Sequence, residues 1–76
     1  METPWRELLS PRERDVVALV ACGGSNRTIA LILGVSQKAV EKHLSNAFTK
    51  LGAVSRTQIA ALVISEGAGR RGLSLQ

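Results

Sequence analysis

Five polar side chains with helical spacing are the residues of this sequence that could recognise another molecule: Lys38, Glu41, Lys42, Ser45 and Thr49. At 3.6 residues per turn they share one face of a helix. Lysine ammonium groups bind phosphates, and carboxylates, hydroxyls and ammonium groups can all bind base edges. Because an ordinary solvated helix face is also polar, the pattern favours a nucleic-acid surface without establishing one.

The helix that carries these side chains is expected to be the second of a helix-turn-helix over residues 25–51. Before it, Ile29, Ala30 and Leu33 fall on one face of a shorter helix. Gly34 can adopt positive φ and end that helix, and Ser36 stands where the N-cap of the next helix belongs. An apolar stripe then follows on the second helix, formed by Val40, Leu44, Ala47, Phe48 and Leu51. In such a motif the second helix enters the DNA major groove.

Two further helices complete the expected fold, which is an all-α four-helix bundle. Ser10 as N-cap, Pro11 at the first helical position and Glu13 as the capping-box partner predict a helix start, and Gly23 and Gly24 end this helix. A second capping-box pattern at 55–58 predicts a last helix to about residue 65. Residues 10–66 are therefore expected to form the domain, after an N-terminal lead-in or linker over 1–9 and before a flexible tail over 67–76. Trp5 either packs on the bundle or belongs to the linker.

Composition limits the possible functions further. The 76 residues carry a formal charge of +4, which favours a polyanionic partner. No apolar run of 18 residues and no signal-peptide pattern occurs, so a cytoplasmic location and no membrane partner are expected. A lone Cys22 provides neither an internal disulfide nor a zinc site. No catalytic set, metal cluster or phosphate-binding glycine loop is recognisable, so we expect neither an enzyme nor a cofactor.

The sequence resembles the DNA-binding domain of LuxR-type (GerE-like) bacterial transcription regulators. The matching blocks are LSPRERDVVALVA, SNRTIALILGVS, AVEKHLSNAFTKLG and SRTQIAAL, which together span residues 9–62. The resemblance implies transcription regulation, with the third helix in the major groove of double-stranded DNA and the fourth commonly used for dimerisation. It also implies an upstream receiver or other signalling domain in many members, as in response regulators, and RNA polymerase as a further partner.

The resemblance also assigns candidate DNA contacts. The family's base-facing positions fall on Glu41, Lys42 and Ser45. Its phosphate-contacting positions fall on Ser36, Lys38, Lys50, Ser55, Arg56 and Thr57, and Asn26 and Arg27 could touch the flanking backbone. Hydroxyls and amides at helix N-termini, together with cations, are natural phosphate partners.

Two residues depart from the family pattern. Glu41 stands where the family often places lysine, and Ala39 replaces a common threonine. A carboxylate is repelled by phosphates, but it can accept a hydrogen bond from the N4 amine of cytosine. It could instead pair with Lys38, Lys42 or Ser45 and weaken binding overall. The sequence leaves these alternatives open.

The last predicted helix has more apolar residues than one face requires. Ile59, Leu62 and Val63 are expected to pack inwards, which leaves Ala60, Ala61 and Ile64 for a weak homodimer interface. Two rival classes of function remain beside DNA-dependent regulation. One is a protein-interaction module on the same scaffold, and the other is a sigma-factor-like promoter-recognition fragment, against which the SRTQIAAL block stands.

Overall fold

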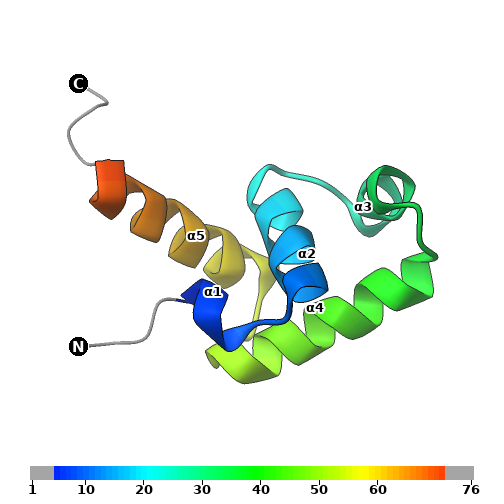
Figure 1. Cartoon of the computed structure of the whole chain (residues 1–76), viewed down its shortest axis with the longest axis horizontal. Coiled ribbons are helices and arrows are strands. Elements are labelled where there is room, and N and C mark those ends of the chain that lie inside the picture. The colour runs from blue at the N-terminus through cyan, green and yellow to red at the C-terminus, as the bar shows by residue number, and fades with distance from the viewer. Residues whose placement is uncertain (1–4, 72–76) are drawn as a thin grey trace.

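The computed structural model describes the backbone of residues 5–71 and the side chains of residues 5–65. Within this part the chain is all-helical, as predicted, and has five helices: α1 (Trp5–Leu8), α2 (Pro11–Ala21), α3 (Asn26–Leu33), α4 (Gln37–Leu51) and α5 (Arg56–Arg71). The helices surround α2, and the C-terminal half of α5 projects away from the others (Figure 1).

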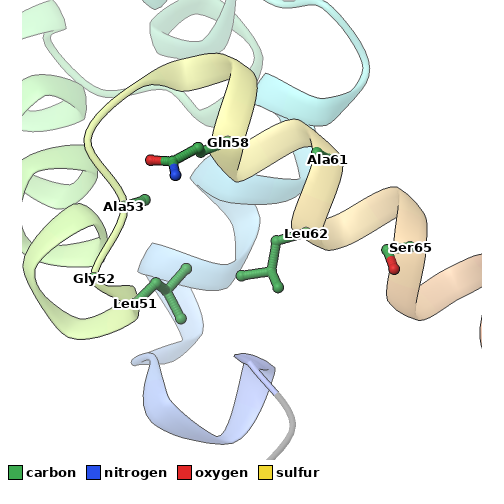
Figure 2. Close-up of a pocket in the computed structure, with 7 residues that line it drawn as sticks. All are labelled: Leu51, Gly52, Ala53, Gln58, Ala61, Leu62 and Ser65. Atoms are coloured by element: carbon green, nitrogen blue, oxygen red, sulfur yellow. The ribbon is translucent and has the colours of Figure 1, made fainter.

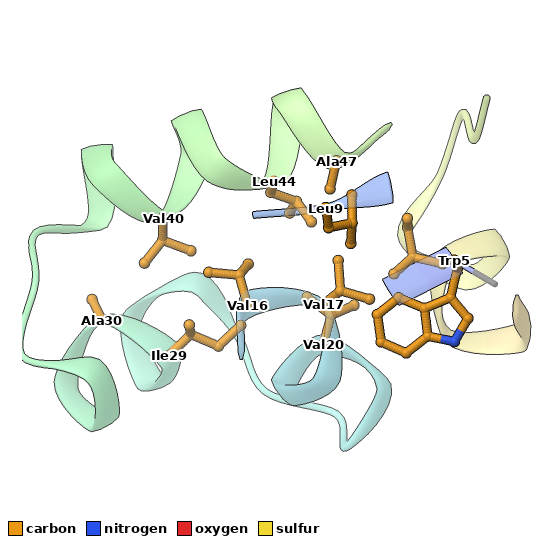
Figure 3. Close-up of a cluster of buried hydrophobic side chains, with 11 residues drawn as sticks. Trp5, Leu9, Val16, Val17, Val20, Ile29, Ala30, Val40, Leu44 and Ala47 are labelled. Atoms are coloured by element: carbon orange, nitrogen blue, oxygen red, sulfur yellow. The ribbon is translucent and has the colours of Figure 1, made fainter. Parts of the chain in front are cut away.

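Helix α2 supplies the centre of the hydrophobic core. Val16 and Val17 are completely buried and Val20 almost so, because α4 and α5 pack on α2 from different sides. Ile29 from α3 and Val40 from α4 meet these valines in the same cluster (Figure 3). Each such side chain contributes roughly 1.5–3 kcal/mol when fully buried, so this cluster is the main stabilising feature of a chain of this size.

The helix-turn-helix predicted over residues 25–51 is present as α3 and α4. Ile29 and Ala30 are buried on the side of α3 that faces α4, and Val40, Leu44 and Ala47 are buried on the matching side of α4. The turn between them begins at Gly34, which has φ 69° and ψ 35°. That left-handed conformation strains residues with a Cβ atom, which explains the glycine at this position.

The predicted N-caps are formed. The Ser10 Oγ accepts from the Glu13 amide while Glu13 Oε1 accepts from the Ser10 amide, completing the capping box. Ser25 and Ser36 cap α3 and α4, each by one hydrogen bond in which the serine hydroxyl oxygen accepts from a backbone amide three residues later. At α5 the backbone amide of Gln58 donates to Ser55 Oγ. The side-chain Oε1 of Gln58 accepts from the backbone amide of Val54 instead of that of Ser55, so the predicted capping box is only half formed.

Three features differ from the sequence-based expectations. The proposed lead-in contains the one-turn helix α1, and burial of the Trp5 indole and Leu9 makes this segment part of the core. The last helix does not end near residue 65: residues 67–71, expected to be tail, continue α5, and residues 72–76 lie outside the described part. Leu62, expected inside, is 37% exposed because Ile59 and Val63 occupy the packed side of α5.

Candidate nucleic-acid interface

The outward face of α4 is the surface on which the predicted base contacts lie. Glu41, Lys42 and Ser45 are all exposed, and so is Lys38 one turn earlier. Helix α4 has 15 residues, which makes it about 22 Å long and, with side chains, about 10–12 Å wide. The major groove of B-DNA is about 12 Å wide, so a helix of this width fits inside it.

The charges on this face are not neutralised by any side chain that the structure describes. Among side chains 5–65 the ion pairs are Arg12 with Asp15 and Lys50 with Glu13, and neither involves Lys38, Glu41 or Lys42. The alternative in which Glu41 pairs with a neighbouring lysine is therefore not what the structure adopts. All three side chains remain available to an external partner.

Lys50 has a more complex environment than a simple phosphate contact. Its Nζ lies 2.7 Å from Oε1 of Glu13, a residue 37 positions earlier at the start of α2. The Glu13 side chain is only 6% exposed, whereas that of Lys50 is 43% exposed. The pair therefore links the C-terminal end of α4 to the N-terminal end of α2, while Lys50 keeps part of its surface towards solvent.

The Glu13 carboxyl is held in its charged form by these contacts. Burial alone would raise its pKa, but hydrogen bonds from Lys50 and Ser10 and the positive charge of Lys50 outweigh that effect. The pKa of Glu13 consequently lies below its ordinary value of 4.5. The negative charge of this carboxylate is also stabilised by the positive, N-terminal end of the α2 dipole.

The other predicted phosphate contacts divide into exposed and engaged residues. Arg27 and Thr57 are exposed near the starts of α3 and α5, and Ser36 is exposed at the start of α4. Asn26 and Arg56 are half-buried and bonded to each other, with Arg56 Nη1 donating to Asn26 Oδ1 at 2.7 Å. Ser55 is half-buried as well, with its hydroxyl oxygen accepting from the Gln58 amide.

Asn46 is a candidate contact that the sequence-based set omitted. It is exposed on α4 and follows Lys42 by four residues, which places both on the same side of the helix. Asparagine can bind adenine through two hydrogen bonds to N6 and N7. The four-residue spacing from Lys42 is the feature of the sequence that could have identified Asn46 as a candidate. Thr49, by contrast, donates its hydroxyl to the Ser45 carbonyl oxygen at 3.2 Å.

A second surface lies between α5 and the loop that joins it to α4. A hollow of about 340 Å³ opens there, lined by Leu51, Gly52, Ala53, Gln58, Ala61, Leu62 and Ser65 (Figure 2). Of the residues predicted to form a dimer interface, Ala61 and Ile64 are exposed and Ala60 is half-buried. The exposed apolar surface of α5 thus includes Leu62 as well.

The described helices and side chains also bear on membrane insertion and metal binding. No helix in the described part of the chain is long and apolar enough to cross a membrane. No group of three histidine, cysteine or acidic side chains lies together there as a metal site would require.

Comparison with known proteins identifies the class to which this fold and surface belong. Residues 7–63 match the luxR family of bacterial regulatory proteins. That match covers most of the chain, so the protein belongs to this family, and its helix-turn-helix is the family's DNA-binding domain.

Individual relatives agree with this assignment. The chain is 47% identical over 64 residues to a putative HTH-type transcriptional regulator of Mycobacterium bovis, covering 84% of this chain and 7% of that protein. It is 46% identical over 56 residues to the transcriptional activator protein BjaR1 of Bradyrhizobium diazoefficiens, with 74% and 23% covered. For the response regulator Rre1 of Synechocystis the values are 41% over 65 residues, with 86% and 28% covered. The chain thus spans less than a third of the length of each of these relatives.

The Glu13–Lys50 pair generates a prediction about stability and pH. In the unfolded chain Glu13 titrates near its ordinary value and in the folded chain below it, so the pair stabilises the fold above that value. This contribution is lost as the pH falls through the lower, folded pKa. We expect Glu13→Gln to cost about 1–3 kcal/mol at pH 7, and its difference from wild type to shrink in acid.

Urea unfolding followed by the fluorescence of Trp5, the single tryptophan, measures this difference. Asp15→Asn is the matched control, because Asp15 pairs with Arg12 on the surface at 3.6 Å and its side chain is 55% exposed. A Glu13→Gln loss that is no larger than the control's, or that is the same at pH 3 as at pH 7, would contradict the account.

Proposed function

We propose that this domain binds double-stranded DNA with α4 in the major groove and thereby activates or represses transcription at particular sites. The observation that carries the proposal is the outward face of α4. Lys38, Glu41 and Lys42 are exposed there and form no ion pair with side chains 5–65, and the opposite face of the helix packs on the core. Family membership supports the same conclusion. Lys42, Glu41 and Ser45 would contact bases, and Lys38, Arg27, Ser36 and Thr57 would contact phosphates.

The wider setting of the domain is also a proposal. One relative is named as a response regulator and another as a transcriptional activator protein, and both are several times longer than this chain. We infer that the domain acts in the cytoplasm as the effector part of a regulator, coupled to a receiver or other signalling domain and to RNA polymerase. No catalytic role is assigned to it.

A second candidate function is protein–protein interaction, and one observation favours it. Leu31 and Ile32 are 75% and 59% exposed and adjacent on α3, on the side away from the buried Ile29 and Ala30. Exposed apolar pairs of this kind are common at protein contacts, although single exposed side chains are ordinary. This surface could operate together with DNA binding, because it does not include the α4 face.

DNA binding itself is tested by its salt dependence. If Lys38 neutralises a phosphate, Lys38→Met should weaken binding to all duplexes alike and reduce the slope of log K against log salt by about 0.9. Fluorescence anisotropy with labelled duplexes, at salt concentrations from about 50 to about 200 mM, measures both the affinity and the salt slope. Arg12→Met removes one positive charge outside the proposed surface and should leave the slope unchanged. A wild-type affinity that does not respond to salt would exclude this function.

The role of Glu41 is tested through base preference. If its carboxylate accepts from a cytosine N4 amine, Glu41→Gln should cost about 1–3 kcal/mol at one base position and leave the others little changed. Selection of bound sites from a random duplex pool, with wild type and variant in parallel, shows which position changes. Asp15→Asn removes a carboxylate elsewhere and should select the wild-type site. If Glu41→Lys strengthens binding to every duplex equally, Glu41 only opposes binding and reads no base.

We further propose weak self-association through α5, with Ala60, Ala61 and Ile64 at the contact and the hollow beside Leu62 receiving part of the partner helix. Small residues allow two helices to approach closely, and a symmetric pair would cover the apolar surface on both copies. The area is small beside the roughly 800 Å² per partner of a standard interface, so the free domain should be monomeric when dilute.

Sedimentation of the domain, alone and on a duplex with two half-sites, tests this association. Wild type should bind the duplex cooperatively as two copies, and Ala61→Glu should bind without cooperativity because a carboxylate is placed in the contact. Ala18→Glu makes the same change at an exposed alanine of α2 and should behave as wild type. One copy per duplex at saturation, or full cooperativity with Ala61→Glu, would refute the proposed dimer.

A further inference from the structure

Arg56, the first residue of α5, makes two contacts that its expected role as a phosphate ligand does not require. Its Nη1 donates to Asn26 Oδ1 at 2.7 Å and its Nη2 donates to the Gly24 carbonyl oxygen at 2.5 Å. The partners lie 30 and 32 residues earlier in the chain, at the junction of α2 and α3. The two terminal nitrogens of one guanidinium are thus directed at two acceptors within the domain.

The acceptors belong to a junction that further contacts hold to both α2 and α3. The Gly24 amide donates to the Leu19 carbonyl oxygen at 2.9 Å, which fixes the loop to the end of α2. A Cβ atom on Gly24 would lie 3.1 Å from both Ile29 Cγ1 and the Leu19 carbonyl oxygen, so the loop also packs closely on α3. Asn26 is the first residue of α3. Arg56 therefore bonds to a point whose position is set by α2 and α3 together.

Few other contacts tie α5 to the helix-turn-helix. Helix α5 packs mainly on α2, through the buried Ile59. Among side chains 5–65, the hydrogen bonds from Arg56 are those that join α5 to the α2–α3 junction. Removing them would leave α5 held on α2 by apolar packing, which resists rotation less than directional bonds do.

We propose that Arg56 is a positioning residue: it sets the orientation of α3, and through α3 that of α4, relative to α5, and it does not neutralise a phosphate. The inference rests on the proposed function, because its readout is DNA binding. Its chemistry demands arginine in particular. A lysine ammonium carries the same charge, but its single nitrogen on a flexible stem cannot reproduce two donors held in a fixed plane.

Arg56→Lys separates the two roles, because lysine would still attract a phosphate. We expect Arg56→Lys and Arg56→Met to lose similar affinity, about tenfold, with the salt slope of wild type. Lys38→Met is the reference for a true phosphate contact and should make the slope shallower. In an Asn26→Ala background, where one of the two bonds is already absent, Arg56→Lys should cost much less than in wild type.

Affinities are compared under conditions in which circular dichroism and Trp5 fluorescence show that every variant is folded. If Arg56→Met does not fold, the comparison of Arg56→Lys with wild type tests the proposal. Hydrogen exchange of the free domain gives a second readout: the Gly24 amide should exchange faster in Arg56→Lys than in wild type. Wild-type affinity in Arg56→Lys, or a slope in Arg56→Met as shallow as in Lys38→Met, would overturn the proposal. A wild-type domain that binds no duplex would instead refute the proposed function.

Discussion

Burial of α2 on several sides is the constraint on which the rest of this structure depends. Val16 and Val17 have no exposed surface, and they can be covered only if α4 and α5 pack on the same short helix from different directions. A chain of 76 residues has material for one such cluster. Each surrounding helix therefore contributes one apolar face and leaves the opposite face free. For α4, the free face is the one that carries Lys38, Glu41 and Lys42.

Four of the basic residues predicted to contact DNA divide into two groups with different physical roles. Lys50 and Arg56 bond to acceptors inside the domain, Glu13 for one and Asn26 with Gly24 for the other. These bonds join helix ends that are far apart in sequence, so they fix how the helices are oriented. Lys38 and Lys42 have no such partner among the described side chains. Net charge alone would have counted all four cations equally, although only the unpaired ones can give their full charge to DNA.

Local patterns in the sequence predicted the helix-turn-helix and its exposed face, because caps, glycine turns and apolar spacing act over three or four residues. Ser36, Gly34 and the Val40 stripe are examples. The one-turn helix α1 is too short to show a period, and burial of Trp5 depends on distant helices. The bonds made by Lys50 and Arg56 span 37 and about 30 residues, so no local pattern could indicate them. The exposed face of α4 could therefore be predicted from the sequence, whereas the bonds that Lys50 and Arg56 make inside the domain could not.

The central claim is that the outward face of α4 is the DNA-binding surface, and a nuclear magnetic resonance titration tests it most directly. Unlabelled duplex is added to the ¹⁵N-labelled domain, and the amide shifts are mapped along the chain. The account predicts the largest shifts on α4 between residues 38 and 46 and at the exposed starts of α3 and α5. Shifts confined to Leu31 and Ile32, or to the hollow beside Leu62, with α4 unchanged, would contradict it.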